Sequence, residues 1–161
     1  MTEATLAEAD AETFARIVEP HLPRLVHLAE RLAGTAYRDD IVQEALLNAW
    51  TRRRSFDPRR GAASSWLLAI VANQARKSWR RRMTIQQPDV ADPGRDEEDR
   101  LDIEDALRHL SPRQRLAVDC HYFVGLSVSE TAAVMGCSEG TVKSTLSDAR
   151  LKLRPRLEVR P

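Results

Sequence analysis

The sequence predicts an all-α protein made of two small helical domains joined by a flexible acidic linker. Apolar residues recur at steps of three and four along the chain and nowhere alternate with period two, so we expect helices and no strands. The 161 residues suffice for one domain or two small ones. Residues 84–101 hold two basic and six acidic side chains, two prolines and few apolar residues. Such a segment cannot bury enough surface to repay ordering, which predicts domains at 1–83 and 102–161 with a linker at 84–101.

The first domain opens with an amphipathic helical pattern that prolines interrupt. Apolar residues from Phe14 to Leu32 share one helix face, Pro20 and Pro23 break or kink the run, and Gly34 ends it.

The second helix of this domain is expected to start at Asp39 or Asp40, which are favourable N-cap residues. Its apolar side is expected to pack, and consists of Ile41, Val42, Ala45, Leu46, Ala49 and Trp50. The opposite side is polar, and consists of Gln43, Glu44, Asn48 and Arg52. A loop at Asp57-Pro58 and Gly61 precedes a third helix, from Trp66 to Trp79, which turns basic at its end.

The second domain carries two helix-start signals of the same kind. Ser111 and Gln114 form a predicted capping box, with Pro112 at the first helical position and an end at Gly125. Ser127 and Glu130 form a second capping box.

The helix that begins at Ser127 belongs to a predicted helix-turn-helix. It stops at Gly136, and Ser138 caps the next helix after a short turn. Ala132 is the small residue where the two helices touch, and Val142 and Leu146 face inward. The outward residues of the last helix are then Glu139, Lys143, Ser144, Ser147, Arg150 and Arg154. The alternative is an ordinary helical hairpin.

Several classes of protein are excluded at this point. The N-terminus is acidic, and no run approaches the roughly 18 apolar residues of a membrane span, so we expect a cytoplasmic protein without membrane insertion. Cys120 and Cys137 lack a metal-site pattern and the four histidines are scattered, so we expect no metal and no cofactor. Asp40 and Glu44 could belong to a metal site of a helical bundle, but the matching ligands that such a site needs on a second helix are missing. No catalytic constellation is present, and we expect no enzyme.

Two sets of motifs resemble the extracytoplasmic-function sigma factors, which belong to the sigma-70 family of bacterial RNA polymerase. Leu110-Ser-Pro-Arg-Gln-Arg115, Gly125-Leu-Ser-Val-Ser-Glu-Thr-Ala132 and Gly140-Thr-Val-Lys-Ser144 resemble region 4 of that family. Asp40-Ile-Val-Gln-Glu44 with Asn48-Ala-Trp50 is similar to region 2.2, and Trp66-Leu-Leu-Ala-Ile70 with Asn73 and Arg80 to regions 2.3 and 2.4. The resemblance implies a factor that binds core polymerase, recognises the −10 and −35 promoter elements and helps to melt DNA.

The resemblance also implies contacts with the polymerase. The residues implied to bind the β′ coiled coil are Asp40, Gln43, Glu44 and Asn48, with Trp50 packing the helix. The β flap is the other expected polymerase contact. Residue types alone also allow a plain solvated helix face here.

The −10 contacts are implied for the third helix and the loop before it. The loop residues, within Ser55 to Ser64, are Ser55, Phe56, Asp57, Arg59 and Arg60, expected to capture a flipped base. The helix residues are Asn73, Arg76, Lys77, Trp79 and Arg80, where cations and an aromatic suit a melted strand. A snorkelling helix end is the alternative. Lys77 stands where the family often has an acidic residue.

The −35 contacts are implied for the last helix. Its expected residues are Ser138, Glu139, Gly140, Thr141, Lys143, Ser144, Ser147 and Arg150. Thr145 and Asp148 stand where the family often has basic residues, which predicts weaker phosphate anchoring. Asp148 is also placed to pair with Lys152 at i,i+4.

A rival function is a stand-alone helix-turn-helix regulator that binds promoter DNA without forming holoenzyme. Because no further domain follows the second helical domain in this sequence, we expect any regulator to be a separate anti-sigma factor.

Overall fold

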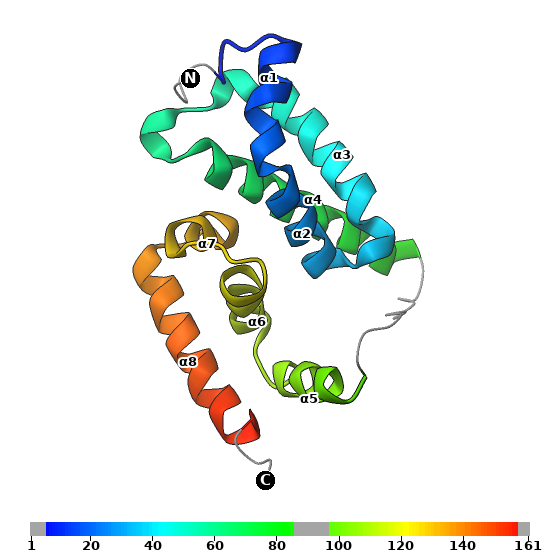
Figure 1. Ribbon diagram of the computed structural model, residues 1–161, viewed down its shortest axis with the longest axis vertical. Helices are drawn as coiled ribbons and strands as arrows, with labels where there is room; N and C mark the ends of the chain where they lie inside the picture. Colours follow the sequence, from blue (N-terminus) through cyan, green and yellow to red (C-terminus); the bar gives the residue numbers. More distant parts are fainter. Residues whose placement is uncertain (1–5, 86–96, 158–161) are drawn as a thin grey trace. The chain divides into compact units, whose positions relative to one another are not determined.

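The computed structural model describes residues 6–85 and 97–157, and every regular element in these two ranges is a helix (Figure 1). This confirms the predicted all-α class. The chain divides into two compact units, Met1–Pro88 and Asp89–Pro161, and the division falls inside the stretch predicted as the linker. No helix in the described ranges is long and apolar enough to span a membrane.

The first unit is built around three helices that pack against one another in pairs, α2, α3 and α4 (Figure 1). Its elements are α1 (Ala11–Val18), η2 (Glu19–His21), α2 (Leu22–Ala33), α3 (Thr35–Arg52), η3 (Arg53–Ser55), η4 (Pro58–Arg60) and α4 (Ala63–Ile85). Pro20 lies in the short 3₁₀ segment between α1 and α2, and Pro23 lies in the first turn of α2. The predicted interruption at the prolines is confirmed.

The core of the first unit is aliphatic with an aromatic edge. Its fully buried large side chains include Leu25, Leu28, Leu67, Leu68 and Val71. Trp50 packs edge-on against Phe14, with ring centroids 5.3 Å apart. The Arg53 guanidinium covers the Trp50 ring at 3.6 Å from its centroid. Trp50 therefore holds α3 onto α1, as expected.

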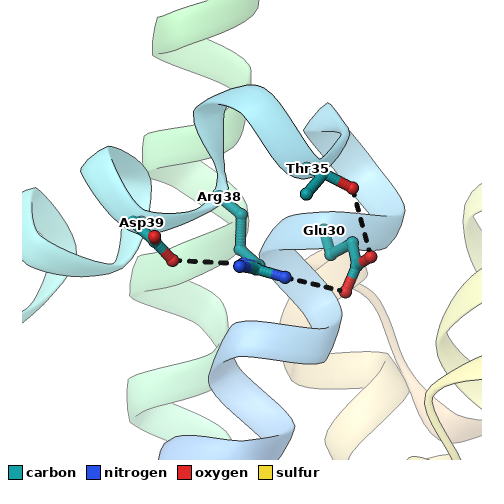
Figure 2. A network of polar contacts seen from close by, with 4 residues as sticks. All are labelled: Glu30, Thr35, Arg38 and Asp39. Carbon is teal, nitrogen blue, oxygen red and sulfur yellow. Dashed lines mark hydrogen bonds and ion pairs between the residues drawn. The ribbon is translucent and has the colours of Figure 1, made fainter. Parts of the chain in front are cut away.

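The start of α3 differs from the prediction. The helix begins at Thr35, with Gly34 as N-cap at φ 85°, rather than at Asp39 or Asp40. Glu30 of α2 accepts hydrogen bonds from Thr35 Oγ1 (3.3 Å) and from Arg38 Nη1 (3.4 Å), as Figure 2 shows. Arg38 Nε also donates to Asp39 Oδ1 at 3.1 Å, and this bond raises the pKa of Arg38. A carboxylate from the preceding helix thus anchors the first turn, so a search for a local capping residue places the start too late.

The second unit contains four α-helices and one π-helical segment within residues 97–157. They are α5 (Glu97–Leu107), α6 (Pro112–Val118), η5 (Asp119–Phe123), α7 (Val128–Met135) and α8 (Glu139–Leu157). Helix α5 begins inside residues 84–101, where composition predicts a linker. Ala106 and Leu107 at its end are buried, and Glu104 pairs with Arg115 of α6 at 2.9 Å. These tertiary contacts stabilise the end of α5 as a helix, although the composition of its start is strongly charged.

Both predicted capping boxes are confirmed. Ser111 Oγ accepts from the Gln114 N–H at 3.2 Å, and Gln114 Oε1 accepts from the Ser111 N–H at 3.0 Å. Ser127 and Glu130 make the same reciprocal pair, at 3.0 and 2.9 Å. The first of these helices widens into the π-helical segment after Val118 before the chain turns at Gly125, so its α-helical part is shorter than predicted.

The predicted helix-turn-helix geometry is confirmed between α7 and α8. Gly136 adopts the left-handed conformation, with φ 65° and ψ 39°, which glycine takes without steric cost. The Cys137 N–H then donates to the Ala132 carbonyl at 3.1 Å. The inward stripe of α8, Val142, Leu146 and Ala149, is buried in the cluster that also contains Ala132, Met135 and Val118.

Candidate functional site

The polar face of α3 is exposed as predicted, except at Asn48. Asp40, Gln43 and Glu44 are exposed, whereas Asn48 is half-buried. Glu44 Oε2 accepts a hydrogen bond from Nε2 of Gln74, a buried residue of α4. The carboxylate of Glu44 therefore lies at the surface of α3 and also bonds α3 to α4 through Gln74.

Leu47 is a surface residue that the sequence analysis did not single out. It lies four residues after Gln43 and seven after Asp40, so these three side chains share one helix face. Leu47 is 66% exposed, unlike the buried residues on the other side of α3. The sequence did contain a sign that Leu47 is exposed, because Leu47 falls outside the apolar stripe of this helix. We call Asp40, Gln43 and Leu47 the α3 face.

Helices α3 and α4 enclose an open, mainly cationic pocket of about 200 Å³. Its lining residues are Asn48 and Arg52 from α3 and Ile70, Asn73, Arg76, Lys77 and Arg80 from α4. We call this the α3–α4 pocket. It brings together four of the expected −10 residues, Asn73, Arg76, Lys77 and Arg80. It also places Asn48 beside them, away from the α3 face, and adds Arg52, which the sequence analysis assigned to no contact.

The loop before α4 is held by packing on the core and by hydrogen bonds within the loop. Phe56 is 6% exposed and its ring packs against Trp66 at 5.4 Å between centroids, so it belongs to the core and not to the exposed loop surface. The expectation of a DNA contact by Phe56 is corrected accordingly. Asp57 accepts hydrogen bonds from Arg59 Nε (3.2 Å) and from the Arg59 N–H (3.0 Å), which hold the pKa of Asp57 below its usual value. Arg60 is exposed.

The basic end of α4 serves two purposes. The Arg82 guanidinium lies 3.8 Å from the Tyr37 ring centroid and 5.6 Å from that of Trp79, so Arg82 fastens α4 to the first turn of α3. Arg80 and Arg81 are exposed, and Trp79 is 48% exposed. Arg82 is therefore a packed side chain whose Nη2 is buried, while the other three side chains face solvent.

The outward side of α8 presents the residues predicted for it. The exposed members of the predicted set are Ser138, Glu139, Gly140, Lys143, Ser144, Ser147 and Arg150, and Thr141 is half-buried. Ser138 Oγ accepts from the Thr141 N–H at 3.2 Å and caps the helix. Ser144 Oγ donates to the Thr141 carbonyl at 3.0 Å, so its hydrogen is engaged and its oxygen can still accept.

Two cations of α8 are linked to neighbouring elements. Arg150 Nη1 donates to the hydroxyl of Tyr122, in η5, at 2.8 Å. Lys152 Nζ donates to Gln114 Oε1 at 3.0 Å. The expected pairing of Lys152 with Asp148 is replaced by this contact, because Gln114 in α6 comes within reach only in the folded unit.

In the described ranges no group of three or more His, Cys, Asp or Glu side chains is placed to hold a metal ion. The surfaces described above present cations, amides, hydroxyl groups and an exposed aromatic ring.

Comparisons with known proteins match both units. Residues 17–84 match the family model "Sigma-70 region 2", and residues 100–153 match "Sigma-70, region 4". The chain is 33% identical to "ECF RNA polymerase sigma factor SigL" of Mycobacterium tuberculosis strain H37Rv, over 94% of this chain and 93% of that one. It is 37% identical to the "RNA polymerase sigma-E factor" of Streptomyces antibioticus, over 96% and 90%.

Two solved structures are similar over most of the chain. One is CnrH in complex with the cytosolic domain of CnrY, with TM-score 0.72 and 26% identity, covering 99% of this chain and 96% of that one. The other is the sigma factor RpoE in complex with the anti-sigma factor NepR from Bartonella quintana. Its TM-score is 0.69 with 30% identity, covering 92% and 98%.

Proposed function

The chain belongs to the sigma-70 family of RNA polymerase sigma factors, in its extracytoplasmic-function group, and from this premise we propose how its surfaces share the work of transcription initiation. As a sigma factor, it associates with core RNA polymerase and directs initiation at promoters. Sigma factors are not themselves catalysts. The observation that carries the assignment is that regions 2 and 4 match in order, each on one compact unit.

The polymerase contact is assigned to the α3 face, with Glu44 at its edge. Asp40 and Gln43 offer a charge and an amide, and Leu47 offers apolar area that the fold leaves exposed. A single exposed apolar side chain is normal on a protein surface, so Leu47 is included because it shares the helix face of Asp40 and Gln43. Asn48 is assigned to the α3–α4 pocket instead, because its side chain lines that pocket.

The −10 element is assigned to the α3–α4 pocket, to the exposed Arg59 and Arg60, and to Trp79. Cationic groups neutralise the phosphates of a strand, and an exposed aromatic ring can stack on its bases. Ser55 and Asp57 shape the loop: Ser55 Oγ donates to the Arg52 carbonyl at 2.6 Å, and Asp57 caps η4. Phe56 supports the loop from the core.

The −35 element is assigned to the exposed side of α8. Glu139 begins the helix and Lys143 and Ser144 follow about one turn later, so Glu139 and Ser144 present acceptor oxygens and Lys143 presents a cation. Acceptors complement the exocyclic amino groups of cytosine and adenine in the major groove. Phosphate anchoring is assigned to Lys143 and to the backbone N–H groups of Glu139 and Gly140 at the helix start. A separate anti-sigma protein is the proposed regulator, since a relative of similar fold is bound by one.

The assignment of the polymerase contact to the α3 face can be tested with variants of that face and a control variant that makes the same change of charge on another helix. Asp40→Arg and Leu47→Ala should weaken assembly with core polymerase, measured by co-purification of the full chain with the core enzyme. Glu12→Arg is the control, since Glu12 is also an exposed helical carboxylate but lies on α1. Thermal unfolding of each variant checks that the fold is kept. Equal recovery of core polymerase by Asp40→Arg, Leu47→Ala and the wild type would remove the assignment of the α3 face.

A further inference from the structure

The α3–α4 pocket is lined almost entirely by hydrogen-bond donors. Arg52 and Asn48 come from the last two turns of α3, and Arg76, Lys77 and Arg80 come from α4. Guanidinium and ammonium groups carry donors and no acceptors. Sequence patterns did not reveal this grouping, because Arg52 and Arg80 are 28 positions apart and meet only through helix packing.

Two acceptors near this pocket are already engaged. Asn73 Oδ1 accepts from Arg76 Nη1 at 2.7 Å, which leaves the Asn73 amide nitrogen as its unengaged end. The carboxylate of Glu44, one turn before Asn48, accepts from Gln74. No acidic side chain lines the pocket. Among the described side chains of residues 6–84, no carboxylate pairs with Arg52, Lys77 or Arg80.

The size and chemistry of the pocket favour a tetrahedral anion over a base or a peptide carboxylate. Its volume of about 200 Å³ is far above what one water molecule needs, so a hydrated or directly bound phosphate fits. Guanidinium groups bind phosphate oxygens in a bidentate manner, and a phosphate has enough oxygens to engage donors from both helices. Ile70 is the single apolar lining residue, which leaves little surface on which a base could stack.

We propose that the α3–α4 pocket binds one phosphodiester group of the promoter strand at the −10 element, with Arg52 and Asn48 of α3 as binding residues beside those of α4. This inference rests on the proposed function, since it names the ligand group at the −10 surface. Its new content is that the C-terminal end of α3 contributes to DNA binding. One phosphate held between α3 and α4 fixes the position of the strand relative to Trp79 and the loop at Arg59 and Arg60.

The test is a double-mutant cycle between the protein and the DNA, made with holoenzyme assembled from core polymerase and the full chain. Promoter DNA carries a neutral methylphosphonate at one position at a time through the −10 element, and the dissociation constant is measured for wild type and Arg52→Ala. The wild type should lose affinity at one particular position. Arg52→Ala should bind unmodified DNA less tightly and should lose no further affinity at that position, because the two changes remove the same contact.

Salt dependence gives a second readout. Loss of one phosphate contact should lower the slope of log affinity against log salt by about 0.7–0.9. The difference between wild type and Arg52→Ala should then shrink roughly threefold between 50 and 200 mM salt. Arg54→Ala is the control, because Arg54 is an exposed arginine two residues away that does not line the pocket. It should keep the wild-type dependence on methylphosphonate position.

The outcomes separate the pocket from the function as a whole. If wild-type holoenzyme forms no promoter complex, the proposed function fails. If the complex forms but every methylphosphonate position affects wild type and Arg52→Ala alike, the pocket proposal is overturned. It is also overturned if inorganic phosphate shifts the NMR signals of Asn48 and Arg52 in the free chain while the methylphosphonate scan stays flat, because the pocket then takes free phosphate only.

Discussion

Replacing Glu44 should affect the stability of the first unit as well as polymerase binding, and the two effects can be separated. Glu44→Ala removes the acceptor of Gln74 Nε2, and Gln74 is buried. A buried donor without a partner costs about 1–3 kcal/mol of folding free energy. In a domain of 60–100 residues each 1 kcal/mol lowers Tm by about 4–8 °C, so Glu44→Ala should lower the Tm of the first unit by at least about 4 °C.

The assay is thermal unfolding followed by tryptophan fluorescence, because Trp50, Trp66 and Trp79 all lie in the first unit. Glu44→Gln keeps an acceptor oxygen for Gln74 while removing the charge, so its Tm should stay near the wild-type value. The double variant Glu44→Ala/Gln74→Leu removes both partners and should recover much of the loss. An unchanged Tm in Glu44→Ala, or an equal loss in Glu44→Gln, would refute the reasoning. Because Glu44→Gln removes the charge without destabilising the fold, a change in its binding to polymerase can be attributed to the loss of that charge.

Three further predictions concern the recognition helix, its partner and the loop before α4. Lys143→Ala should lower the salt slope of promoter binding by holoenzyme by about 0.9, with an unchanged preference across −35 variants; a changed preference at constant slope would show base contact instead. Ser127→Ala should destabilise the second unit by about 0.5–2 kcal/mol in denaturant unfolding followed by circular dichroism, because it removes a cap that Glu130 reciprocates; no change would show the cap to be dispensable. Arg59→Ala should raise the pKa of Asp57 toward its ordinary value in an NMR titration. Because the pKa of Asp57 is lowered in the folded chain, Asp57 stabilises the fold at pH values above its unfolded-state pKa, and this stabilisation is lost as the pH falls through its folded-state pKa. An unchanged pKa of Asp57 in Arg59→Ala would show that Arg59 does not cause the shift.

The features that the sequence predicted well depend only on residues that lie close together along the chain. A capping box needs only residues three apart, so Ser111 with Gln114 and Ser127 with Glu130 are visible in the sequence and form in the structure. The left-handed Gly136 is similarly local. The inward stripe of α8 follows from helical periodicity alone.

The features that sequence did not predict depend on contacts between helices. The start of α3 depends on Glu30 of α2, which lies outside any local capping rule. Arg82 belongs to a basic run but is held by the Tyr37 ring of another helix. Phe56 lies in a polar loop, and only its packing on Trp66 shows it to be core.

The central claim is that this chain directs initiation as part of RNA polymerase holoenzyme and not as a free DNA-binding protein. The most direct measurement compares run-off transcription and promoter footprints for the chain alone, core polymerase alone and the two combined, on DNA selected for binding by the combination. The account predicts a footprint over the −35 and −10 elements and a transcript of defined start only when both are present. A full footprint by the chain alone, with no promoter-specific transcript on adding core polymerase, would contradict it.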